Sequence, residues 1–507
     1  MRATSTVFQE KLQEKILAAT GGKKRPLLEA VQTTIVPPKN GTTSRGITFN
    51  DEVEEVINRQ SESKAIEALD AEIEKLNKEY FVTVVGSTVC ISHITIDPES
   101  GGTTIRTLMQ EGFRLAHKNR TIQIIDKDGN TKRVQLADAW LTSHIRRQFL
   151  GGMAMLPNLP VPPNVYNLYQ GFGVVPVPGD AKPALQHILN VICGGDKAVA
   201  KYCFQWMAYC VQRPERPAEV ALVMQGGRGS GKGTVARWLT KIFAPHSLQI
   251  TQSKHLVGNF NGHLHNCLFL FVDEAFFAGD KQGESTLKGL ITEPTIAIER
   301  KGFDVIQVTN RLKCAMATNS SWAVPAGEDE RRFFIVRVSD CHKQDHEYFE
   351  RLNSHMENGG LAAFLDFLLK MDISDFNIRA IPSTKALDEQ KLLSMPPLEA
   401  WLYSRLYEGQ LQKLDTGWET KQGRDDLCAE FAEFVKSKGS RHVSTDSTSV
   451  GMRLRTLIPE IKEGRDTPAK GRKRLWIFPP LSTARKSFAE STGLKHVEWP
   501  ADVEGEK

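Results

Sequence analysis

The stretch that most constrains this chain is VALVMQGGRGSGKGT, which runs from Val220 to Thr234. An apolar run leads into closely spaced glycines around one lysine, and a helical pattern of apolar residues follows over 235–242. Glycines let the backbone curl so that its N–H groups point at a phosphate, whose approach a Cβ would block. Strand, loop and helix together predict an α/β domain built around a phosphate-binding loop.

The loop also names the residues that would bind a nucleotide. Lys232 would bring a positive charge to the β and γ phosphate oxygens. Gly233 departs from the usual pattern, because a Ser or Thr there would supply a hydroxyl to Mg²⁺. Either the Thr234 hydroxyl binds an α-phosphate oxygen, or a water completes the metal shell; Thr234 is kept as a candidate metal ligand. The full set of expected nucleotide contacts is Gly226, Gly227, Gly229, Ser230, Gly231, Lys232, Gly233 and Thr234.

An acidic pair follows the apolar run 268–272 in CLFLFVDEAF. Such a run is typical of a buried parallel strand, and ligands bind at the carboxyl ends of parallel strands. We expect Asp273 to hold Mg²⁺ through water and Glu274 to polarise an attacking water. The pair favours hydrolysis over transfer to another acceptor. The GKGT ending alone does not separate a motor from a nucleotide kinase.

Two further motifs complete the expected catalytic set. LKCAMATNSSW predicts a strand that ends near Asn319, whose amide could orient the attacking water. In DERRFFIV, Arg331 and Arg332 precede another apolar strand, and we expect one of them to reach the nucleotide of a neighbouring subunit. That arrangement predicts a ring. The alternative is a surface ion pair with Asp329 or Glu330.

A basic hairpin is predicted between these strands. Ile296 and Ile298 alternate towards Arg300 and Lys301, and an apolar return follows over 305–308. A basic tip at this place could bind the phosphate backbone of DNA, which a nucleotide kinase would not need.

The C-terminal part predicts two amphipathic helices, over 427–435 and within STDSTSVGMRLRTL, the second with a Ser or Thr cap. A basic turn and an apolar strand follow in PAKGRKRLWIFPPL. Together they suggest a winged helix that contacts DNA phosphates. The alternative is a solvated hairpin. The candidate contacts are Lys470, Arg472, Lys473 and Arg474.

Four parts of the chain are predicted. They are a basic flexible arm (1–60), an α+β module with a proline-rich connector (61–180), an ATPase domain (181–395) and a winged-helix-like domain (396–507). In the second part, apolar residues from Ile66 to Tyr80 predict a helix that begins near Ser61 and packs on the strands that follow.

The motifs over 190–395 resemble those of the superfamily 3 helicases of the AAA+ class, in the phage and plasmid branch of the poxvirus-type primase-helicases. The matching stretches are GGRGSGKGT, FVDEAF, the ERKG hairpin, MATN and DERRF. The resemblance implies a P-loop AAA+ core, ATP and Mg²⁺, and a hexameric ring that translocates on single-stranded DNA in phage, prophage or plasmid replication. It also implies the roles given above for Lys232, Asp273, Glu274, Asn319 and the arginine pair.

The expected fold class is therefore α/β, and the leading function is an ATP-dependent DNA helicase that acts on single-stranded and forked DNA. The alternatives are an ATP-dependent initiator or loader that does not unwind DNA, and a nucleotide kinase. No convincing D-x-D metal pair or zinc spacing precedes the ATPase, so we expect no primase activity on this chain and a separate primase or polymerase as partner. Eight scattered cysteines and the absence of a long apolar run favour a reduced, cytoplasmic protein without membrane contact, in a bacterial host if a phage encodes it.

Overall fold

The computed structural model describes residues 49–96, 103–125, 131–252, 258, 260–274, 281–324, 327, 330–413, 415–439, 443–466 and 473–501. The chain divides into two units, each considered by itself: Met1–Ala68 with Gln123–Lys132, and Leu69–Ile122 with Arg133–Lys507. Residues 1–48 of the predicted basic arm, including its proline-rich stretch, lie outside the described residues. The DKDGN turn, residues 126–130, also lies outside them.

The first described element is the helix α3 (Phe49–Glu79), which begins well before the predicted start at Ser61. Of the predicted stripe, Ile73 and Leu76 are buried, whereas Ile66 is 59% exposed. Tyr80 is the first residue of a strand and not the last of the helix. The apolar stripe is therefore used only towards the end of the helix.

A four-stranded sheet follows, in the order β3-β2-β1-β6. Its strands are β1 (Tyr80–Val85), β2 (Thr88–Ile96), β3 (Thr103–Leu108) and β6 (Gln148–Phe149). The helices α4 (Gln110–Ala116) and α5 (Leu136–Thr142) contribute Phe113 and Trp140 to the core of this module. The remaining short strands are β4 (Thr121–Ile125), β5 (Thr131–Gln135), β7 (Met153–Ala154) and β8 (Tyr166–Asn167).

The centre of the chain is a five-stranded sheet in the order β10-β11-β14-β9-β15, with every neighbouring pair parallel. The strands are β9 (Ala221–Gln225), β10 (Ser247–Ile250), β11 (Phe269–Asp273), β14 (Lys313–Thr318) and β15 (Phe333–Arg337). In β9, β11, β14 and β15 the side chains are almost all buried, as continuous apolar runs predict for a parallel sheet covered on both faces, whereas in the edge strand β10 only Ile250 is buried.

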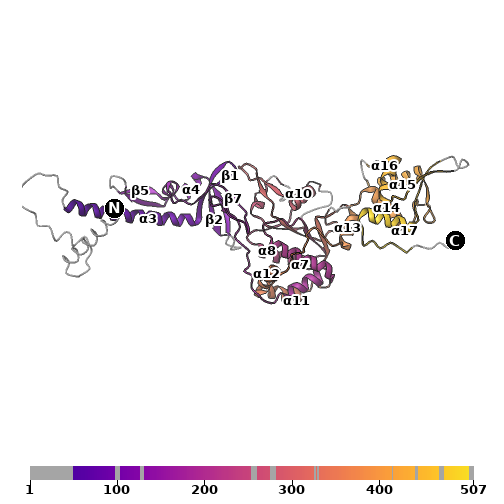
Figure 1. Cartoon of the computed structure of the whole chain (residues 1–507), viewed down its shortest axis with the longest axis horizontal. Helices are drawn as coiled ribbons and strands as arrows, with labels where there is room; N and C mark the ends of the chain where they lie inside the picture. The colour runs from indigo at the N-terminus through magenta and orange to yellow at the C-terminus, as the bar shows by residue number, and fades with distance from the viewer. Residues whose placement is uncertain are drawn as a thin grey trace, which may run out of the picture. The chain divides into compact units, whose positions relative to one another are not determined.

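Each face of this sheet has its own core. Leu222, Phe271 and Phe334 pack on one face with α7 (Lys197–Gln212), α8 (Lys232–Phe243) and α12 (Leu361–Lys370). The alternate residues of the same strands pack with α10 (Lys281–Thr292) and α13 (Lys385–Leu393). Figure 1 shows α7, α8, α11 (His346–His355) and α12 gathered on one side of the sheet, with α10 on the other.

Three more elements complete this region. The helix α6 (Lys182–His187) continues into a π-helical turn, η1 (Ile188–Ile192), and a second such turn, η3 (Met356–Gly360), joins α11 to α12. A short 3₁₀ helix, η2 (Gly262–Asn266), precedes β11. The predicted hairpin is present as β12 (Thr295–Ile298) and β13 (Ile306–Thr309), which pair in antiparallel register.

The C-terminal core begins at Leu398 and joins α14 (Pro397–Glu408), α15 (Arg424–Ser437), α16 (Ser447–Leu457) and α17 (Leu481–Thr492). Three short strands form a sheet in the order β16-β18-β17: β16 (Lys421–Gly423), β17 (Lys462–Arg465) and β18 (Arg474–Ile477). The predicted Ser or Thr cap of α16 is wrong. Asp446 caps the helix by accepting from the backbone N–H groups of Thr448 and Ser449, and its negative charge suits the helix N-terminus.

All eight cysteines are free, and six of them are buried. Within the described ranges, every helix falls short of the length and apolarity that a bilayer-spanning segment requires.

Candidate functional site

The candidate site lies at the carboxyl edge of the parallel sheet, where several predicted residues meet. Gly226 follows β9, Asp273 ends β11 and Asn319 follows β14. Backbone hydrogen bonds link these strand ends: Gly226 N donates to Thr318 O at 3.1 Å, and Glu274 N donates to Ala317 O at 2.9 Å. The sheet thus brings together residues that are far apart in the sequence.

The glycine-rich loop, residues 226–231, connects β9 to α8. Gly229 and Gly231 have φ angles of +74° and +94°, which side chains with a Cβ rarely adopt. A Cβ on Gly231 would lie 2.8 Å from the ring of Phe349. The loop therefore needs glycine for both its backbone conformation and its close packing.

Two side chains brace the loop from within. Ser230 Oγ donates to Gly227 O at 2.9 Å, and Lys232 Nζ donates to the same carbonyl at 3.1 Å. The Lys232 side chain thus folds back over the loop, so its ammonium lies at the concave backbone that would cradle a phosphate.

Asp273 lies half-buried among charged side chains. Burial raises the pKa of its carboxyl, and the neighbouring Glu274 carboxylate raises it further. The cations of Lys232 and Arg237 act in the opposite direction, as does Gln249 Nε2, which donates to Asp273 Oδ2 at 3.3 Å. These shifts place both cations within electrostatic range of this carboxylate.

Glu274 is exposed and has a φ of +53°, the left-handed region that side chains with a Cβ disfavour. Its backbone N–H is held by the carbonyl of Ala317. The strain is located at the residue predicted to act on water, and backbone strain of this kind clusters at functional sites.

Asn319 is exposed at the end of β14. The loop that follows is fastened to the strand that leads into the glycine-rich loop, because Gln225 Nε2 donates to Ser320 O at 2.9 Å and Ser321 O at 2.7 Å. Asn319 is therefore held at the same edge as Asp273 by a structured loop.

The arginine pair lies elsewhere. Arg331 and Arg332 precede β15, whose first residue, Phe333, pairs with Ala221 at the amino end of β9. Arg331 is exposed, and Arg332 is half-buried. Both arginines thus lie at the sheet edge opposite the glycine-rich loop, away from the candidate site of their own chain. Of the alternative ion-pair partners, Asp329 lies outside the described residues.

The basic hairpin presents its two cations differently. Arg300 is half-buried, its Nη2 lies 2.6 Å from His265 Nδ1, and burial lowers the pKa of its guanidinium. Lys301 is exposed. Lys301 is thus accessible to DNA, whereas Arg300 is engaged inside the protein.

In the C-terminal part, Lys470 and Arg472 lie outside the described residues. Lys473 and Arg474 are exposed at the start of β18, and Lys473 Nζ is 3.9 Å from Asp426 Oδ2. The described end of the predicted basic turn therefore faces solvent.

Sequence reasoning missed Arg237, which lies on α8 beside the loop. Its Nη2 donates to Thr234 Oγ1 at 3.2 Å. The spacing of three residues on a predicted helix was the available signal, because such residues share a helix face.

His187 was also missed. It is fully buried next to Gly231, and its Nδ1 lies 3.0 Å from the hydroxyl of Tyr348. Burial lowers the pKa of its imidazole to about 4, so the ring is neutral near pH 7. No local pattern in the sequence connects this residue to the loop.

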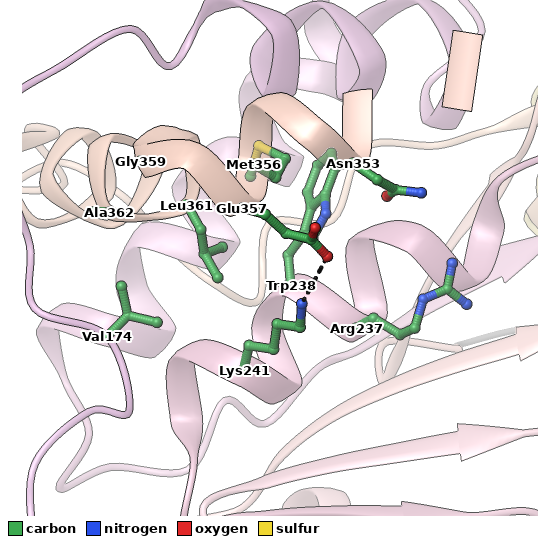
Figure 2. Close-up of a pocket in the computed structure, with 10 residues that line it drawn as sticks. All are labelled: Val174, Arg237, Trp238, Lys241, Asn353, Met356, Glu357, Gly359, Leu361 and Ala362. Carbon is green, nitrogen blue, oxygen red and sulfur yellow. Dashed lines mark ion pairs between the residues drawn. The ribbon is translucent and has the colours of Figure 1, made fainter. Parts of the chain in front are cut away.

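A cavity of about 450 Å³ adjoins the same helix. It is lined by Arg237, Trp238 and Lys241 of α8 and by the segment around Glu357. Figure 2 shows Lys241 and Arg237 leaving the helix in different directions, with Lys241 Nζ 3.8 Å from Glu357 Oε1.

The residues present fit a nucleotide with its metal. A Cβ on Gly226, Gly227 or Gly231 would lie 2.8–3.0 Å from a neighbouring side chain, so the loop can follow this tight path only with glycine, and Lys232 supplies a cation there. Mg²⁺ bound to phosphates usually needs only one or two protein carboxylates, which Asp273 can provide. Within the described part of the chain, no three or more His, Cys, Asp or Glu side chains gather as a metal site made by protein alone.

Comparison with known proteins gives one matching family and one curated relative. A family of unknown function, DUF5906, matches residues 224–332, which include the glycine-rich loop, the acidic pair and the hairpin. The chain is 27% identical over 197 residues to the DNA primase-polymerase of Nitratiruptor phage NrS-1. This match covers 38% of the chain but only 27% of the phage protein.

Solved structures extend the likeness to most of the chain. The apo structure of the NrS-1 C-terminal region matches with a TM-score of 0.56 at 16% identity, over 79% of this chain and 96% of that one. A second structure, the A form of the same region, matches with a TM-score of 0.55 over 80% of this chain. At this identity the likeness shows a shared fold. The chain is thus related to part of a phage replication protein.

Proposed function

We propose that this chain is an ATP-dependent DNA helicase with a P-loop core of the AAA+ type, acting in phage, prophage or plasmid DNA replication. The observation that carries the proposal is the meeting of the glycine-rich loop, Asp273, Glu274 and Asn319 at one edge of a parallel sheet. In this proposal the loop binds the phosphates of a nucleotide beside the acid pair, and the Asn319 amide lies just after the adjacent strand β14.

In the proposed reaction, the loop N–H groups and Lys232 bind the phosphates and stabilise the charge that develops on them. Mg²⁺, when bound with the nucleotide, would neutralise phosphate charge. Asp273 would hold the metal's water ligands, Glu274 would accept a proton from the attacking water, and Asn319 would orient that water. The half-buried surroundings of Asp273 strengthen the electrostatic contacts of its own carboxylate.

The opposite edge of the sheet supports the proposal of a homo-oligomer, which the resemblance suggests is a hexamer. The exposed Arg331 cannot serve the nucleotide of its own chain from there, but it can reach a site on a neighbouring copy. A ring built in this way would place Lys301 and its equivalents where they can bind single-stranded DNA.

The relationship to the NrS-1 protein supports the replication role, because that relative is named a DNA primase-polymerase. The sequence match covers only 27% of that relative, and the primase activity in the relative's name does not extend to this chain on that ground. A separate primase or polymerase remains the proposed partner.

The test is ATP hydrolysis by the purified chain with and without single-stranded DNA, beside the variant Lys232→Ala. DNA should accelerate hydrolysis by the wild-type chain, and the variant should lose at least about a hundredfold in rate, because it removes a charge that stabilises the transition state. Undiminished hydrolysis by Lys232→Ala would remove the proposed site. Turnover that ignores DNA would favour the nucleotide kinase.

Strand displacement on a forked duplex separates the remaining alternative. A helicase should release the displaced strand only when ATP is hydrolysed. Hydrolysis that DNA stimulates without strand release would favour an initiator or loader, which uses the same site.

A further inference from the structure

The guanidinium of Arg237 borders the place where the glycine-rich loop departs from the common pattern. An ideal Cβ built on Gly233 would lie 3.1 Å from Arg237 Nη1. Gly233 has no side chain to supply the usual hydroxyl, and the Arg237 guanidinium lies next to the position that such a side chain would occupy.

The same guanidinium also interacts with Thr234 and Asp273. Its Nη2 donates to Thr234 Oγ1, and its charge acts on Asp273 across the site. Because Thr234 Oγ1 accepts from Arg237, its own O–H remains available as a donor. A donor hydroxyl suits a phosphate oxygen, whereas a metal ion would compete with the cation for the oxygen lone pairs.

Arg237 has no acidic partner in the part of the chain that the structure describes. Among the described residues, no carboxylate lies within ion-pair distance of its guanidinium, although Lys241, one turn further along the exposed side of α8, pairs with Glu357. The forked guanidinium can therefore donate to two phosphate oxygens at once.

We propose that Arg237 is a nucleotide-binding residue that takes over part of the role of the missing hydroxyl at position 233, by donating directly to phosphate oxygens on the Asp273 side of the loop. Thr234 then donates to a phosphate oxygen and does not ligate the metal. The inference rests on the proposed nucleotide site and adds that binding of ATP depends less on Mg²⁺ than in a loop with Ser or Thr at position 233.

The test measures binding of ATP to the full chain by calorimetry, once with Mg²⁺ and once with a chelator. Arg237→Ala should bind ATP at least about tenfold more weakly than the wild-type chain in the chelator, since a charge-assisted hydrogen bond is lost. Arg237→Lys, which keeps the charge but not the fork, should lie between them. Lys241→Ala is the matched control and should bind as the wild type does.

A second variant links the effect to position 233. Gly233→Ser in the Arg237→Ala background should regain affinity with Mg²⁺ but not with the chelator, because the new hydroxyl serves the metal. Thermal unfolding of each variant checks that the substitutions leave the fold intact.

The outcomes separate the two proposals. If Lys232→Ala loses ATP binding while Arg237→Ala binds as the wild type does in the chelator, the role of Arg237 is overturned and the nucleotide site stands. If the wild-type chain binds no ATP under either condition, both are overturned.

Discussion

At the scale of single residues, Glu274 combines an exposed carboxylate with a strained backbone. Its φ of +53° lies in the left-handed region, which costs an ordinary residue about 1 to 2 kcal/mol. The parallel strands hold it there, because its N–H is bonded to the carbonyl of Ala317.

Glycine at position 274 should therefore relieve this strain. We expect Glu274→Gly to be about 1 kcal/mol more stable than Glu274→Ala, although both lose hydrolysis. The measurement is the thermal midpoint of unfolding beside the rate of ATP hydrolysis. Glu274→Gln, which keeps size and conformation, is the control for ATP binding without turnover. A midpoint for Glu274→Ala equal to or above that of Glu274→Gly would show that the backbone is not strained.

Sequence patterns identified some residues of the site and missed others for a physical reason. Lys232, Asp273 and Asn319 could be expected, because each follows a strand or lies in a loop with a local signature. His187 could not, since its contact with the loop depends on how α6 packs beside α8. Contacts within a buried aromatic cluster such as that of His187 produce no regular spacing in the sequence, so they cannot be predicted from it.

At the scale of elements, the hairpin of β12 and β13 carries two cations with different environments. Arg300 is held by His265, which comes from the helix η2. Burial and the Arg300 cation together lower the pKa of the His265 imidazole to about 4, so the pair is a neutral ring beside a guanidinium near pH 7. Lys301, by contrast, is exposed to solvent.

Substitutions at the two positions should have different effects. Lys301→Ala is expected to weaken binding of single-stranded DNA several-fold and to reduce its salt dependence, because a phosphate contact is lost. Arg300→Ala should instead lower the thermal midpoint, because it removes a half-buried contact. Fluorescence anisotropy with a salt series and thermal unfolding measure the two effects. Unchanged DNA binding by Lys301→Ala would mean that the hairpin is not a DNA contact.

At the scale of the whole molecule, the sheet separates the candidate site from the arginine pair. The carboxyl edge carries the glycine-rich loop, and the amino edge carries Arg331 and Arg332. Arg331 is exposed and can meet another copy of the chain. A complete site in the proposed ring therefore needs two subunits.

Mixing two inactive variants tests whether each site is formed by two subunits. Lys232→Ala and the double variant Arg331→Ala/Arg332→Ala should each lose ATP hydrolysis when alone. Mixed and reassembled in equal amounts, they should recover part of it, because some interfaces combine an intact loop with an intact arginine pair. A mixture as inactive as its components, together with assembly shown by light scattering, would contradict a shared site.

Local patterns alone established the strands, the glycine-rich loop, the acidic pair and the hairpin, because periodicity and backbone conformation depend on neighbours in the chain. The start of α3 and the cap of α16 were misjudged where local signals competed. Strand order and parallel pairing decided the rest. Because β14 lies between β11 and β9, Asp273 and Asn319 reach the same edge as the loop, and because β15 runs parallel to β9, Arg331 at its start lies at the opposite edge. Such contacts depend on how buried faces pack together, and that packing is not encoded in any short stretch of residues.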